Sequence, residues 1–198
     1  MNNVVVVTAP SFEPVTLAEA KLWCRVDDDD RSQDAVLQML IIAMREYAEH
    51  LTGRAFASRT LELRLDAFPD AEIELPQAPL NSVTSIEYVN DDGLQNLNGS
   101  PTAFQVDTGS IPGRIAPLVG SSWPSSSGDA LAAVRIRYVA GYPNPNAIPK
   151  LVRLWMQARI STLFENREQI ITEGQVQKLP RDFVDGLLDG LKVDFGFA

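Results

Sequence analysis

Few residues of this sequence have the types and the spacing that chemistry requires. The most conspicuous polar feature is the run of four aspartates Asp27–Asp30. A calcium-binding EF-hand loop would need alternating ligands, a glycine at its sixth position and a glutamate at its twelfth. Counted from Asp27, those two positions hold Ser32 and Gln38, so the motif fails. We therefore interpret the run as a solvated turn that also caps the helix after it.

The single histidine and the single cysteine add little evidence for a catalytic or metal-binding site. Because His50 is the only histidine, a catalytic triad or a two-histidine zinc site would lack a member. It lies near a predicted helix C-terminus, where the helix dipole favours an imidazolium, and we interpret it as structural. Cys24 excludes an internal disulfide and is interpreted as a small buried apolar side chain.

No other motif indicates catalysis. The phosphate-binding, dinucleotide-binding and nucleophile-elbow motifs are missing from the sequence. Among the 26 acidic residues, no spacing singles out a carboxylate pair. The sequence therefore predicts no enzyme, no metal site and no cofactor.

The composition limits the possible partners. At 198 residues, the chain is long enough for one domain with a real core. Its net charge of −9 argues against a free-standing nucleic-acid binder but allows a surface past which DNA slides. One cysteine suits a reducing compartment, and the apolar run Val4–Val7 is too short to span a membrane. We expect a soluble, intracellular protein.

Two consecutive helices between Pro14 and Phe56 organise the chain. Thr16 and Glu19 have the spacing of a capping box, which predicts a first helix over about residues 16–25. A second helix is predicted over about 34–52, and Gly53 suits the position after its end. The apolar face predicted for it consists of Leu37, Leu40, Met44, Tyr47 and Leu51.

The rest of the body is predicted to be a β-rich part, residues 59–140, followed by a third helix over about 148–165. Alternating apolar residues predict strands at 59–68, 83–89 and 134–139, with shorter ones at 73–75, 94–97, 103–106 and 114–118. Asp92-Gly93 predicts a tight turn. For the third helix, the predicted stripe is Leu151, Trp155, Ala158 and Thr162. This order predicts an α+β fold, a helical bundle with an inserted antiparallel β-rich part and a C-terminal amphipathic helix.

Residues 179–198 are predicted to be a docking helix and tail attached to a body of residues 1–178. The helix expected at 180–191 contains Gly186 and Gly190, which each cost about 1 kcal/mol relative to alanine. Such a helix needs a surface to pack on, either its own body or another subunit. The docking candidates are Phe183, Val184, Leu187, Leu188, Leu191, Phe195 and Phe197.

Two other segments are candidates for contacts between subunits. Val4, Val5, Val6 and Val7 form an extended arm that can pair with a sheet edge of its own chain or of a neighbour. Trp123 lies in the serine-rich loop 119–130, where a tryptophan either folds back onto the body or waits for a partner.

Four blocks, in this order, resemble the head–tail connector proteins of tailed phages, also called adaptor or head-completion proteins. They are PVTLAEAKLWCRVDDDDRSQDAVLQMLIIAMREYAEHLTGRAF, IELPQAPLNSVTSIEYVNDDG, VRIRYVAGYPNPNAIPKLVRLWMQARISTLFENRE and LPRDFVDGLLDGL. The order and spacing of the blocks carry the resemblance, which covers nearly the whole chain.

The resemblance implies a structural protein without a catalytic site. Such a protein forms a ring of about twelve copies below the portal, extends its DNA channel and presents a lower face to a stopper or tail-completion protein. DNA would pass through the lumen without sequence-specific binding. The resemblance places the protein at the head–tail junction of a phage or a phage-like gene transfer agent, made in the bacterial cytoplasm and without membrane contact. Two alternatives remain open: another completion protein, such as a stopper or tail terminator, and a small host-interaction module.

Overall fold

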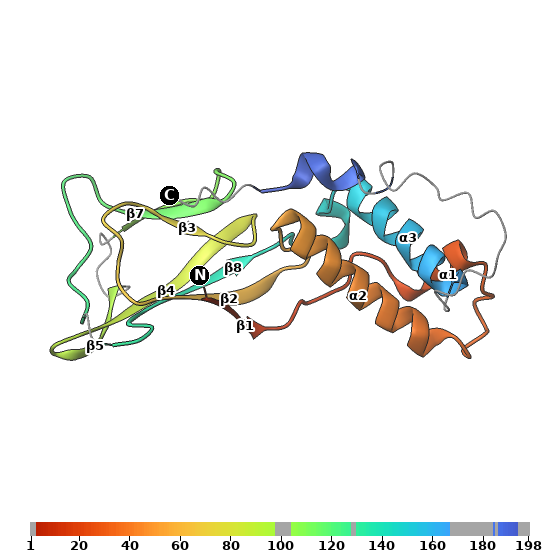
Figure 1. The fold of residues 1–198 in the computed structure, drawn as a ribbon, viewed down its shortest axis with the longest axis horizontal. Helices are drawn as coiled ribbons and strands as arrows, with labels where there is room; N and C mark the ends of the chain where they lie inside the picture. Colours follow the sequence, from red (N-terminus) through yellow and green to blue (C-terminus); the bar gives the residue numbers. More distant parts are fainter. Residues whose placement is uncertain (1–2, 98–103, 128–129, 167–183, 185, 194–198) are drawn as a thin grey trace, which may run out of the picture. The chain divides into compact units, whose positions relative to one another are not determined.

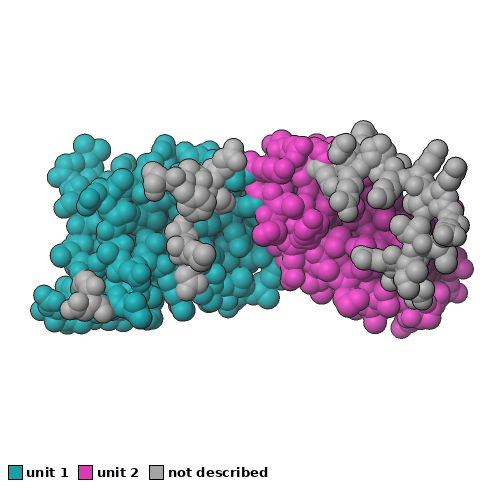
Figure 2. All heavy atoms as spheres, in the orientation of Figure 1, with its two compact units in different colours: residues 1–11, 53–142, 193–198 teal, residues 12–52, 143–192 magenta. Residues whose placement is uncertain are grey.

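The computed structural model describes residues 3–97, 104–127, 130–166, 184 and 186–193 (Figure 1). The chain forms two compact units (Figure 2). The helical unit comprises residues 12–52 and 143–192. The strand unit comprises residues 1–11, 53–142 and 193–198, so most of its chain is inserted between two helices of the other unit.

Among the residues that the structure describes, three α-helices build the helical unit. They are α1 (Leu17–Cys24), α2 (Asp34–Thr52) and α3 (Lys150–Glu165), and each contacts the other two. Two 3₁₀ helices accompany them, η2 (Pro145–Ala147) before α3 and η3 (Gly186–Leu191), which contacts α2 and α3. Within the described residues, no helix is both long enough and apolar enough to cross a membrane.

The start of α1 has the capping box that its sequence predicts. The hydroxyl of Thr16 accepts the backbone N–H of Glu19 at 3.2 Å, and the Glu19 carboxylate accepts the N–H of Thr16 at 2.9 Å. Glu19 also forms an ion pair with Arg153 of α3. Burial alone would raise the pKa of Glu19, but the hydrogen bonds with Thr16 and the charge of Arg153 lower it below its ordinary value. One carboxylate thus caps α1 and ties it to α3.

The buried faces of α2 and α3 differ from the predicted ones. In α2, Leu37 is buried as expected, but Leu40, Met44 and Leu51 are only half-buried and Tyr47 is exposed. In α3, Trp155 is buried, whereas Leu151 is 48% exposed. The buried residues of α2 are Leu37, Ile41, Arg45, Ala48, Glu49 and Thr52, and those of α3 are Val152, Trp155, Met156 and Ile160. The predicted stripe of α2 was placed wrongly, because the buried face of this helix includes the charged pair Arg45 and Glu49. Hydrophobicity alone would exclude both residues from a buried face.

The strand unit contains two antiparallel sheets. The larger has the order β1-β2-β8-β4-β5 and the smaller the order β3-β7-β6. Figure 1 shows the smaller sheet lying over the larger. The strands are β1 (Asn3–Thr8), β2 (Arg59–Leu65), β3 (Ile73–Leu75), β4 (Leu80–Asn90), β5 (Gly93–Asn96), β6 (Phe104–Asp107), β7 (Gly113–Pro117) and β8 (Val134–Ala140).

One hydrophobic core lies between the two sheets. It includes Leu61 and Leu63 from β2 and Ile136 from β8, together with Ile73 and Ile115 from the smaller sheet. The strand register explains this arrangement, because Leu61 pairs with Tyr138 and Leu63 with Ile136, which places these side chains on one face. The alternating apolar residues of β2 and β8 therefore lie on the face that packs in the core.

Two turns have the predicted glycine geometry. Asn90 pairs with Gly93 across the β4–β5 hairpin, and Gly93 has a φ of +99°. Gly53 follows α2 with a φ of +67°, in the left-handed region that a helix terminus favours.

The presence of helices and antiparallel sheets confirms the predicted α+β class. The predicted C-terminal α-helix is represented in the described residues by the 3₁₀ helix η3, while residues 180–183 lie outside them. The division into a body of residues 1–178 and a docking segment of residues 179–198 stays a prediction.

Candidate assembly surfaces

The aspartate run is held from inside the helical unit by one buried lysine. The Lys21 ammonium donates to the carbonyl oxygens of Asp28 at 3.2 Å and Asp30 at 2.8 Å, and lies 2.7 Å from the Asp34 carboxylate. The expectation that the run caps the next helix is wrong, because α2 begins at Asp34 and Asp30 instead accepts the N–H of Ser32 at 2.8 Å. These hydrogen bonds with Ser32 lower the pKa of the Asp30 carboxyl. The run is a fixed, exposed acidic turn.

The cysteine and the histidine lie in different settings. Cys24 is 8% exposed on α1, and burial raises the pKa of its thiol, with the Glu165 carboxylate adding to the effect. A protonated, buried thiol is a poor nucleophile. His50 is exposed in the last turn of α2. Among the described residues, no three His, Cys, Asp or Glu side chains are grouped as metal ligands.

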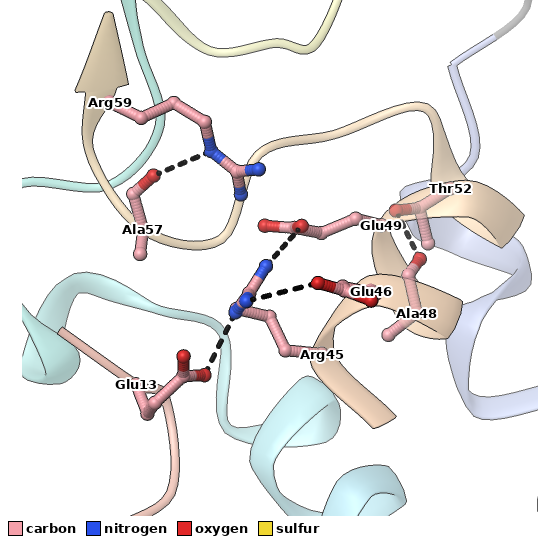
Figure 3. A network of polar contacts seen from close by, with 8 residues as sticks. All are labelled: Glu13, Arg45, Glu46, Ala48, Glu49, Thr52, Ala57 and Arg59. Atoms are coloured by element: carbon pink, nitrogen blue, oxygen red, sulfur yellow. Dashed lines mark hydrogen bonds and ion pairs between the residues drawn. The ribbon is translucent and has the colours of Figure 1, made fainter. Parts of the chain in front are cut away.

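A buried arginine lies at the centre of a polar network (Figure 3). The guanidinium of Arg45 lies 2.8 Å from a Glu13 oxygen, 2.9 Å from a Glu49 oxygen and 3.7 Å from a Glu46 oxygen. Burial alone would lower the pKa of Arg45, but the hydrogen bond with Glu13 and the nearby carboxylates raise it. The network ties the segment before α1 to α2, which is a structural role.

A second network covers the polar face of the larger sheet. Glu62 is 5% exposed although it alternates with the core leucines of β2. Its carboxylate oxygens lie 2.8 Å from Arg64 and 2.9 Å from Arg137, its partner across the strands. Burial alone would raise the pKa of Glu62, but the hydrogen bonds from Arg137 and Arg64 lower it. The two arginines thus keep this covered carboxylate ionised.

A shallow hollow of about 190 Å³ lies on the smaller sheet. Arg114 at its edge lies 2.8 Å from Glu72 and 3.1 Å from Asp107. Hydrogen bonds from Ser110 and Arg114 lower the pKa of Asp107 to about 2. The charged groups of the hollow are therefore paired with one another, which leaves little to attract a charged ligand.

Trp123 folds back onto its own unit. Its ring stacks on Phe68 with the centroids 5.0 Å apart, and its indole N–H donates to the Ala71 carbonyl at 2.9 Å. Phe68 in turn meets the ring of Tyr88 edge to face. Of the two alternatives for Trp123, the structure shows the first, and a contact between subunits at this half-buried side chain stays a prediction.

The valine arm is a strand of its own chain. In β1, Val4 pairs with Leu63 of β2 and also packs against the core of the strand unit. Val5 pairs with Glu62 and Val6 with Leu61, and the register shifts between Val6 and Thr8. Val6 is 50% exposed and Val7 43% exposed. The arm is therefore an edge strand with exposed valines.

The docking candidates near the C-terminus differ in exposure. Leu188 is 1% exposed in the helical unit, where η3 contacts α2 and α3, so its side chain is not available to a partner. Val184, Leu187 and Leu191 are half-buried. Phe183, Phe195 and Phe197 lie outside the described residues.

Sequence reasoning missed a group of exposed apolar side chains on the first two helices. Leu22 and Trp23 of α1 are 77% and 42% exposed, and Met39 and Ile42 of α2 are 62% and 43% exposed. Exposed apolar side chains of this size are common at protein–protein contacts. For Met39 and Ile42, the available signal was their position off the predicted apolar stripe of α2. Lys21 and Arg45 were also missed, because their partners are fixed by the fold.

The comparisons with known proteins agree with this fold. Residues 14–92 match the family profile described as phage gp6-like head–tail connector protein. No curated protein sequence matches the chain.

Solved structures share the fold over nearly the whole chain. A chain from the neck of an empty GTA particle, computed with C6 symmetry, has a TM-score of 0.78 and 21% identity, covering 98% of this chain and 96% of that one. A chain from the virion of a native gene transfer agent (GTA) particle has a TM-score of 0.77 and 20% identity, with 97% and 96% covered. A chain from the neck of a native GTA particle, computed with C12 symmetry, has a TM-score of 0.70 and 22% identity, with 98% and 96% covered.

The family match covers α1, α2 and the strands β2, β3 and β4, and it ends in the β4–β5 turn. It includes the first of the four sequence blocks and nearly all of the second. The head–tail connector family recognised from those blocks is thus confirmed over residues 14–92, which carry the signature of the phage gp6-like connectors.

Proposed function

We propose that this chain is a structural head–tail connector of a tailed phage or a phage-like particle. It forms a ring below the portal, extends the DNA channel and links head to tail. The match of residues 14–92 to the gp6-like connector family carries this proposal. The fold shared with chains of GTA particles supports it and favours the phage-like setting.

The ring contains about twelve copies in contact head to tail, which requires two different complementary surfaces on each chain. The C6 and C12 symmetries used for the necks of the related particles are compatible with this number. Exposed apolar side chains are available on β1 and on helices α1 and α2. The chain therefore offers more than one surface for self-association.

DNA passes through the lumen without being bound. Each chain has a net charge of −9, and a ring of such chains surrounds the channel with negative potential. Repulsion of the phosphates keeps the DNA from adhering to the wall. The protein's role in this passage is mechanical and needs no cofactor.

The ring binds the portal on one side and a stopper or tail-completion protein on the other. Val184, Leu187 and Leu191 of the C-terminal segment contact the portal, together with Phe183, Phe195 and Phe197. Leu188 stays in its own helical unit, because it is already buried there. The segment therefore docks through the side chains that the helical unit leaves partly exposed.

Native mass spectrometry of the full chain, alone and mixed with its cognate portal, tests the proposal. Twelve chains of 21.8 kDa give a ring of about 260 kDa. We expect this ring or a stoichiometric complex with the portal ring. A chain that stays monomeric and ignores the portal would contradict the connector function and favour a host-interaction module.

Removing residues 194–198 tests the docking segment separately. We expect the portal complex to weaken and the ring to persist, because the deletion removes Phe195 and Phe197 but leaves η3 in place. An unchanged affinity for the portal would exclude the two aromatic residues from the docking surface.

A further inference from the structure

The first half of α2 is apolar on every side, yet one side of it is exposed. Nine of the ten residues 35–44 are apolar and none is charged. A helical segment of this kind is normally buried all round. Here Met39 is 62% exposed and Ile42 is 43% exposed, and Ala35 and Ala43 are exposed as well. The other three lie three or four positions from Met39, so the four residues share one side of the helix, which we call the α2 face.

The next charged residue of the helix adds no charge to the α2 face. Arg45 is 4% exposed, and its guanidinium is paired with Glu13 and Glu49 inside the helical unit. The side of a helix that stays in water normally carries charged and polar residues. The α2 face is therefore unusual for a permanently solvated surface and typical of a protein contact.

A second face of the same kind lies on α3. Leu151 is 48% exposed and Leu154 is 40% exposed, while Thr162 is exposed and Ala158 is half-buried. Their spacing of three, four and four residues places them on one side of the helix, which we call the α3 face. The Thr162 hydroxyl donates to the Ala158 carbonyl at 2.8 Å, so the one polar side chain of this face is satisfied within its own helix.

The two arginines within α3 belong to other contacts. Arg153 forms an ion pair with Glu19 of α1. The guanidinium of Arg159 lies 5.8 Å from the ring centroid of the buried Trp155. The other charged residues of α3, Lys150 and Glu165, are its first and its last. The α3 face is therefore uncharged between its two ends.

The two faces do not cover one another within one chain. Figure 1 shows α2 and α3 side by side, and the two helices contact each other and α1. A side chain that packed on the neighbouring helix would be buried, whereas the large apolar side chains of both faces are exposed. At 1.5 Å per residue, the α2 face is about 12 Å long and the α3 face about 17 Å long, so one can cover the other in a second copy.

We propose that the α2 face of one copy packs on the α3 face of the next copy. This inference rests on the proposed ring and names one of its contacts. The two faces are different surfaces of one chain, which is what a head-to-tail contact requires. Rows of side chains three and four residues apart can interdigitate as in other helix pairs, and their burial removes apolar surface from water.

Charge favours a second copy as the occupant of these faces. Each chain has a net charge of −9, so most of its surface repels another copy. Two such chains approach most easily where neither surface is charged, and the α2 and α3 faces meet this condition. A partner attracted by charge would find no counter-charge on either face.

Cross-linking between two single-cysteine variants tests the contact. Both use the full chain with Cys24→Ala, one with Met39→Cys and the other with Leu154→Cys. Because each chain then has one thiol, any link joins two copies. A short bismaleimide bridges the thiols without the strict geometry that a disulfide needs. In rings from the two variants expressed together, we expect a link between positions 39 and 154, identified by mass spectrometry of the digested product.

The same variants expressed separately are the first control. A head-to-tail contact places position 39 beside position 154 of the neighbour, so we expect neither a 39–39 link nor a 154–154 link. Val119→Cys in place of Met39→Cys is the matched control, because Val119 is 95% exposed but lies in the strand unit. Equal linking by Val119→Cys, or a 39–39 link as strong as the 39–154 link, would overturn the proposed pairing.

An added carboxylate tests the contact without cross-linking. Met39→Glu or Leu154→Glu places an unpaired charge in the apolar contact, so the ring fraction at fixed concentration should fall at least about tenfold. Gln38→Glu is the control, because it adds the same charge at an exposed position turned about 100° from position 39. We expect a change of less than about twofold there. Circular dichroism should be unchanged in all three variants, because the substituted side chains are exposed.

Native mass spectrometry of these variants, alone and with the portal, separates the outcomes. Intact rings in Met39→Glu and Leu154→Glu, with no 39–154 link, would overturn this contact and leave the connector function intact. Rings that persist but no longer bind the portal would assign the faces to the portal and also overturn the contact. An unsubstituted chain that stays monomeric with and without the portal would overturn both proposals.

Discussion

Lys21 is 4% exposed, and its ammonium reaches two backbone carbonyls and one carboxylate. Arg45 and Glu62 are also buried, and each is surrounded by opposite charges from its own unit. A buried charge is tolerated when it is paired and hydrogen-bonded in this way. These residues fix segments of the chain in place.

The substitution Lys21→Met tests this role. It leaves the carbonyls of Asp28 and Asp30 without their donor and the Asp34 carboxylate without its counter-charge. We expect a loss of about 1–3 kcal/mol in the free energy of unfolding, measured by urea denaturation. Lys150→Met is the matched control, because Lys150 is exposed and its loss should change stability by less than about 0.5 kcal/mol. Equal losses in the two variants would show that the Lys21 contacts contribute little.

Residue contacts could be predicted from the sequence only where they are local. Thr16 and Glu19 form their box because both partners lie within one helical turn. Lys21 binds carbonyls seven and nine residues away, and the shape of the turn decides that contact. The hypothesis that Asp30 caps α2 is wrong, because the Asp30 carboxylate accepts the nearby N–H of Ser32 instead. Trp123 could not be placed from the sequence, because the residues that it contacts, Phe68 and Ala71, lie far earlier in the chain.

At the scale of elements, Gly141 lies where its own backbone closely approaches the backbone of Ala57. It follows β8 with a φ of +107°, and a Cβ atom there would lie 2.4 Å from the Ala57 carbonyl oxygen. Its N–H donates to Pro79 at 2.9 Å, and its carbonyl accepts from the Asn81 side chain at 2.8 Å. The glycine in the AGY block thus lets three segments of the strand unit meet.

Gly141→Ala should therefore destabilise the chain strongly. Backbone strain and the clash with Ala57 together should cost at least about 3 kcal/mol of unfolding free energy. Gly120→Ala is the control, because Gly120 also has a positive φ, +83°, but open space around it. Only strain of about 1–2 kcal/mol is expected there. If chemical denaturation gave the same loss for both variants, the close approach to Ala57 would have no energetic weight.

Elements were easier to predict than their arrangement. Period-two alternation identifies β2, β4 and β8 because each buries one face, and glycine marks the turn into β5. The strand order cannot be read in this way, because nothing local states that β8 lies between β2 and β4. The fold places β1 on its own sheet and η3 against its own helices, and whether either segment also contacts another subunit stays a prediction.

At the scale of the whole molecule, charge and apolar surface act in opposite directions. Each chain has a net charge of −9, so neighbouring copies repel one another. Contacts between copies through exposed apolar side chains, such as those of α1 and α2, are screened little by salt. Assembly should therefore be limited by repulsion, which salt does screen.

Raising sodium chloride from about 0.01 M to about 0.1 M should accordingly favour the ring. The screening length falls from about 30 Å to about 10 Å over this range, which weakens the repulsion between copies. Sedimentation velocity should show a larger ring fraction at the higher concentration. The double variant Asp28→Asn and Asp29→Asn, with a net charge of −7 in place of −9, should assemble more readily at low salt and respond less to added salt. A ring that dissociates as salt is added would instead place ion pairs between the copies.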